Sequence, residues 1–110
     1  MEDTSLTGQA TALNRAIGAI IAQLDIDALP APERSIAESI KRQAADARLD
    51  VRDYEYADTR AEQLQRADIA NKRLEEIQSA IVKASEYNMF SAIDVAQLSA
   101  TIQRVIAQIS

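Results

Sequence analysis

The side chains best suited to acid–base chemistry in this sequence are closely spaced carboxylates, such as Glu75 beside Glu76 and Asp50 three residues before Asp53. Two such groups can act as general acid and general base when their surroundings separate their pKa values. The chain has no histidine and no cysteine, so it lacks the commonest general base, the thiol nucleophile and the preferred zinc ligands. Di-iron bundles also need Glu-x-x-His ligands. We therefore expect solvated surface carboxylates, no cofactor or metal, and no enzymatic activity.

The overall charge and the hydropathy limit the partners and the location of the protein. The formal net charge is −5, which repels phosphate backbones and anionic lipid, so nucleic acid is not an expected partner. No apolar run approaches the ~20 residues that a membrane span needs. The first residues include Glu2 and Asp3, whereas a secretory signal begins with basic residues. We expect a cytoplasmic protein, with export by a signal-less route left open.

The few aromatic residues are the natural anchors for a protein interface, because the rest of the apolar content is aliphatic. Tyr54 falls on the apolar seam of its segment and Tyr56 does not, so Tyr56→Ala is expected to leave stability nearly unchanged. The group around Tyr87 has two interpretations, a cap over the end of the core or an exposed contact. The candidate partner contacts are Tyr54, Tyr56, Asp58, Tyr87, Met89 and Phe90.

The elements that would carry these residues are helices. The whole chain has two glycines and two prolines, so it has few of the turn-forming residues that β-hairpins need. In the first segment, apolar residues recur at alternating steps of three and four, and this spacing predicts a helix over about 5–25. Pro30 and Pro32 end that pattern, so residues 26–32 are expected to form a loop.

The middle segment, from about 33 to 86, contains no glycine and no proline. It predicts either one long helix or a kinked pair, with the break between Leu49 and Arg60, where charges crowd and the apolar seam is thin. A last helix is expected over about 92–109, because Ser91 and Asp94 have the spacing of a capping box. The expected core or oligomer seam comprises Leu13, Ile17, Ile20, Leu24, Leu74, Ile77, Ile81, Leu98, Ile102 and Val105.

These elements predict a single all-α domain over residues 1–110. Short connections favour an antiparallel three-helix bundle with a long central coiled-coil-like helix, or a four-helix bundle if the middle helix breaks. Two short helices cannot cover every side of a helix up to ~80 Å long, at 1.5 Å per residue. An apolar stripe would then remain for a partner.

The function expected from this architecture is a non-enzymatic interaction module that self-assembles into a homodimer or a larger scaffold. The alternative is a small acidic adaptor, chaperone or inhibitor that binds a basic protein client. The two differ in salt dependence, because an apolar oligomer persists at high ionic strength and an acidic recognition surface loses its client. The charged contacts of the alternative would be Asp25, Asp27, Asp50, Asp53, Glu55 and Asp58.

Overall fold

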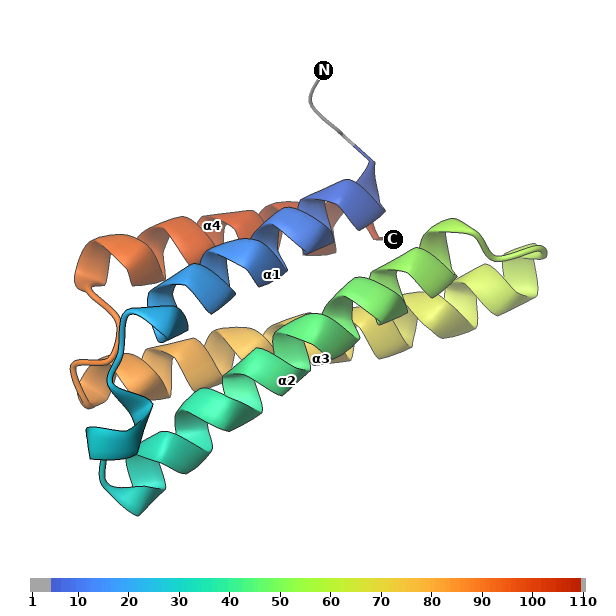
Figure 1. Cartoon of the computed structure of the whole chain (residues 1–110). Coiled ribbons are helices and arrows are strands. Elements are labelled where there is room, and N and C mark those ends of the chain that lie inside the picture. Colours follow the sequence, from blue (N-terminus) through green and yellow to red (C-terminus); the bar gives the residue numbers. More distant parts are fainter. Residues whose placement is uncertain (1–4, 110) are drawn as a thin grey trace.

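The computed structural model describes residues 5–109 and contains four α-helices in this range (Figure 1). Residues 1–4, with the acidic start of the chain, and Ser110 lie outside the described residues. No strand occurs between residues 5 and 109, so the predicted all-α class is confirmed. The elements are α1 (Leu6–Ala22), the 3₁₀ turn η1 (Ile26–Ala28), α2 (Ala31–Glu55), α3 (Arg60–Glu86) and α4 (Ala92–Gln108).

The middle segment is two helices, so the single long central helix is not formed. The break at residues 56–59 lies inside the interval where the apolar seam is thin. Thr59 is extended, with φ −126° and ψ 157°, and its hydroxyl accepts the N–H of Glu62 at 3.1 Å. This N-cap satisfies one of the backbone donors that the start of α3 leaves open. The four-helix alternative is therefore the observed one.

The four helices run antiparallel to their chain neighbours, and α1 also packs against α4 (Figure 1). The apolar seams of all four helices face one shared core. Its largest members with almost no exposed surface are aliphatic, and burying each such side chain contributes about 1.5–3 kcal/mol. Those side chains are Ile17, Ile40, Val51, Leu74, Ile77, Ile81, Ile102, Val105 and Ile109.

The turn between α3 and α4 depends on Asn88, which has φ 61°. Its N–H donates to the carbonyl of Ser85 at 3.0 Å, and the N–H of Met89 donates to the carbonyl of Ala84 at 3.2 Å. This pair of bonds is a Schellman motif, which ends a helix through one left-handed residue. Asparagine tolerates that conformation better than residues other than glycine.

Asn88 therefore gives a prediction for stability. Asn88→Ala is expected to lower the free energy of unfolding by about 0.5–1 kcal/mol, because a Cβ without a local hydrogen-bonding group is strained at positive φ. Asn88→Gly is expected to be neutral or stabilising. Urea unfolding of both variants measures this difference, and an alanine variant as stable as the glycine variant would contradict it.

Candidate interaction surfaces

The structure places the predicted seam inside the bundle. Of its ten residues, eight are buried, and Ile20 and Leu24 are partly buried against the core. The seam residues therefore pack against other helices of the same chain, and they do not form an exposed apolar stripe to which a partner could bind. The eight buried residues are Leu13, Ile17, Leu74, Ile77, Ile81, Leu98, Ile102 and Val105.

The predicted partner contacts divide into two groups. Tyr54, Met89 and Phe90 are buried, so the structure favours the core-cap interpretation for the residues after α3 and places Tyr54 in the core. Tyr56 is 70% exposed and Tyr87 is 43% exposed. Asp58 is exposed in the turn between α2 and α3. Tyr56 and Tyr87 therefore remain as accessible aromatic anchors, at opposite ends of α3.

The α2–α3 hairpin extends beyond the neighbouring helices at the turn that joins α2 to α3 (Figure 1). Asn71 donates from its Nδ2 to the carbonyl of Ile109 at 3.2 Å, so α4 ends beside Asn71. Because α3 has 27 residues and α4 has 17, residues 60–70 of α3 continue past the end of α4. Leu64 is 51% exposed on this uncovered part.

A second group of side chains with exposed surface lies at the same end of the hairpin, on the end of α2 and the start of α3. A hollow of about 210 Å³ is lined by Arg66 of α3, Asp53 of α2 and Tyr56, which directly follows α2. Ile69, 41% exposed, stands three residues after Arg66 and four before Arg73. Since residues at these helical spacings share one face, Ile69 lies on the side of α3 that adjoins α2. We call the following residues the distal patch: Arg52, Asp53, Tyr56, Glu62, Arg66 and Ile69.

The charges of the distal patch balance, with two arginines and two carboxylates. One ion pair within it is Arg52 Nη2 with Asp53 Oδ1 at 3.9 Å, and both side chains are about half exposed. An exposed pair at this distance contributes little to stability. The four charged groups are therefore available to a partner at small cost.

Next to the patch, Arg73 Nε donates to Asp50 Oδ2 at 3.1 Å and links α3 to α2. Because Arg73 donates this hydrogen bond to the Asp50 carboxylate, the pKa of Arg73 is raised above its ordinary value; the Asp50 charge adds to this rise, and desolvation opposes it. The guanidinium thus stays charged under all ordinary conditions. This bond connects the two helices beside the patch.

Glu55, at the end of α2, binds the start of α1. Its carboxylate accepts the N–H of Leu6 at 2.8 Å and the hydroxyl of Thr7 at 2.7 Å. The first N–H groups of a helix lack partners within it and carry partial positive charge, so a carboxylate there is stabilising. Sequence reasoning placed Glu55 among the client contacts, because no local signal links it to a helix 48 residues earlier.

Removing this cap should be measurable. Glu55→Ala is expected to lower the free energy of unfolding by about 1–2 kcal/mol, because two donors of α1 lose their acceptor. Glu75→Ala is the matched control, since Glu75 is exposed on α3. Thermal unfolding of the two variants makes the comparison, and equal melting temperatures would show that the cap contributes nothing.

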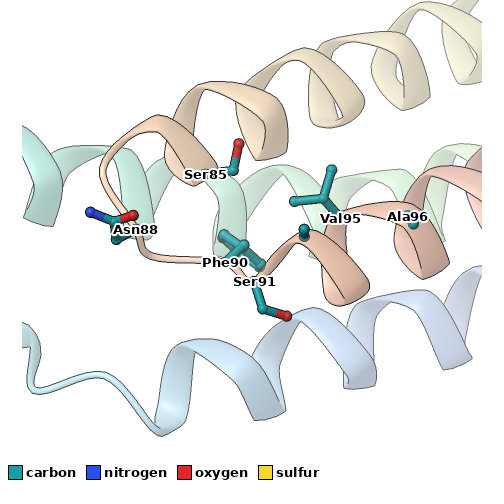
Figure 2. A pocket seen from close by; sticks show the side chains of 7 residues that line it. Ser85, Asn88, Phe90, Ser91, Val95 and Ala96 are labelled. Carbon is teal, nitrogen blue, oxygen red and sulfur yellow. The ribbon is translucent and has the colours of Figure 1, made fainter.

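Another hollow lies between the end of α3 and the start of α4, as Figure 2 shows. It is an open groove of about 620 Å³ with Phe90 and Val95 among its apolar side chains, and no charged residue lines it. The hydrogen bond from Gln103 to Gln78, at 2.6 Å, links α4 to α3 farther along. The remaining lining residues are Ser85, Asn88, Ser91, Ala92 and Ala96.

Neither surface has the groups that metal chemistry would need. Across residues 5–109, no three acidic side chains come together in a way that would hold an ion. The same residues contain no helix with the length and hydropathy required for a membrane crossing. No protein-family model, curated protein or solved structure matches the chain.

Proposed function

We propose that this protein is a non-enzymatic interaction module that self-assembles through helix packing at the distal patch. The observation that carries the proposal is the exposure of large apolar side chains at one end of the α2–α3 hairpin. Tyr56 is 70% exposed and Ile69 is 41% exposed, with Leu49 at 38% on the same part of α2. Exposed aromatic and aliphatic side chains with polar surroundings are typical of protein interfaces.

The broken middle helix changes where the uncovered surface is expected. A single long helix would have left a stripe along much of its length, but α2 and α3 cover each other when folded as a hairpin. What remains is the distal end, where residues 60–70 of α3 continue past the end of α4, because α3 has 27 residues and α4 has 17. The proposed contact is therefore confined to this end.

The acidic-adaptor alternative has less support from the contacts. Asp50 is bonded to Arg73, and Glu55 caps α1. A basic client would have to displace these partners before it could use the carboxylates. Asp25 lies just before η1, at the other end of α2 from Asp58, so these two do not form one acidic surface.

The test is the solution mass by light scattering at low and high salt. The wild-type protein is expected to give a multiple of 12.0 kDa at both salt concentrations, because salt does not screen the apolar contacts that Tyr56 and Ile69 make. Tyr56→Ala is expected to shift the mass toward 12.0 kDa while leaving the helicity of the chain nearly unchanged.

The matched control is Tyr87→Ala, since Tyr87 is also exposed but lies at the opposite end of α3. This variant should keep the wild-type mass. A wild-type protein that stays monomeric up to high concentration would overturn the proposed function.

A further inference from the structure

We propose that the distal patch binds the distal patch of a second copy about a two-fold axis, with Arg52 and Arg66 of each copy facing Asp53 and Glu62 of the other. This inference rests on the proposed function and specifies its partner and geometry. A two-fold interface uses the same residues on both sides, so each copy must carry both halves of every complementary contact.

The charge distribution is what points to a second copy. The chain carries a formal net charge of −5, so two copies repel each other over most approaches. The hollow at the distal end is lined by two arginines, two carboxylates and Tyr56, and its formal charge is therefore zero. The patch therefore adds no net repulsion to self-association, and its opposite charges can pair across the contact.

The order of the charges along the two helices also fits a two-fold arrangement. Each helix contributes one residue of each sign, Arg52 and Asp53 from α2, and Glu62 and Arg66 from α3. If one helix carried charges of a single sign, a two-fold rotation could place like charges opposite each other. Each helix carries both signs here, so this arrangement is avoided. Rotation by 180° can therefore bring arginines of one copy to carboxylates of the other.

Tyr56 is the apolar anchor of this interface. It lines the hollow and is 70% exposed, and tyrosines in such surroundings dominate many interfaces. Near the axis its ring packs against the Tyr56 and Ile69 of the second copy. Because residues 60–70 extend past the end of α4, α4 does not obstruct the approach.

The experiment exchanges the charges of the patch in two variants of the full chain. The acidic variant carries Arg52→Glu and Arg66→Glu, and the basic variant carries Asp53→Lys and Glu62→Lys. Each is expected to be at least tenfold weaker than wild type in self-association at low salt, because like charges face each other. A 1:1 mixture is expected to restore the mass of two chains, since the patches are then complementary.

Two further measurements make the result specific. The control variant carries Lys41→Glu and Arg42→Glu, which are exposed on α2 away from the patch and change the net charge as much as the acidic variant does. It should keep the wild-type mass. Circular dichroism of all variants establishes that they remain helical. High salt should partly restore self-association of the acidic variant by screening the repulsion.

The outcomes separate this inference from the proposed function. A monomeric wild-type protein overturns both. If wild type self-associates but both variants do so equally well alone, or the mixture does not reassemble, the two-fold charge pairing is overturned and self-assembly stands. Masses that grow beyond two chains with concentration would indicate a head-to-tail contact, such as Tyr56 entering the α3–α4 groove of the next copy, and would also overturn the two-fold geometry.

Discussion

Ile77→Asp is expected to unfold the protein at room temperature. Ile77 is 0% exposed in the middle of α3. Deleting its aliphatic side chain costs about 2–5 kcal/mol, and a buried carboxylate without a partner adds several more. Since a domain of this kind has only about 5–15 kcal/mol of stability in total, the sum is enough to abolish folding. Loss of the helical far-ultraviolet circular dichroism signal measures the effect.

The matched control is Ile93→Asp, which makes the same change at a position 69% exposed in the first turn of α4. A carboxylate is favourable near a helix N-terminus, so this variant should keep its fold. Leu98→Asp, at 5% exposure, should behave like Ile77→Asp. Full helicity in both core variants would show that the proposed core is wrong.

Ala44→Leu is expected to be the next most damaging change. Ala44 is 1% exposed on the buried face of α2, and protein cores are closely packed with few voids. Three added carbons have no space there and force side chains or helices apart, at a cost of about 1–3 kcal/mol. Denaturant unfolding should show a lower midpoint with an unchanged slope.

Ala45→Leu is the control, because Ala45 is the next residue in the same helix and is exposed. Leucine and alanine have similar helix propensities, so this variant should lie within about 0.5 kcal/mol of wild type. Similar losses in the two leucine variants would mean that the cost comes from the helix itself and not from the packing of its buried face.

Both predictions test how much stability the core of the bundle provides, and this bears on the proposed interaction. Buried alanines occur in α1, α2 and α3, and each buries less apolar area than a larger aliphatic residue. A core of this kind is modestly stable. Covering Tyr56 and Ile69 in a dimer would add burial that the monomer lacks, and would couple stability to protein concentration.

The positions of the helices and their buried faces were determined by the sequence itself. Steps of three and four residues place Ile17, Leu74 and Ile102 on single faces of their helices, and all three are buried. This inference works because helical periodicity is a local property of the chain. The absence of histidine and cysteine likewise removes the commonest general base, the thiol nucleophile and the preferred zinc ligands before any fold is known.

Tertiary structure decided whether the middle segment is one helix or two. The seam had already distinguished the buried Tyr54 from the exposed Tyr56, which are 7% and 70% exposed, because residues two apart on a helix point to nearly opposite sides. The break at residues 56–59 was one of two alternatives in the sequence, and the hairpin is favoured because it turns both apolar faces toward a single core.

Contacts between distant segments also came only from the fold. Glu55 was an acidic surface residue by its sequence, and its partners Leu6 and Thr7 lie nearly fifty residues away. The distal patch likewise combines three residues before residue 57 with others after residue 59, around a hollow that no local sequence pattern marks. Periodicity tells which side of a helix is apolar, but which helix covers it, and where that cover ends, depends on the lengths and packing of all four together.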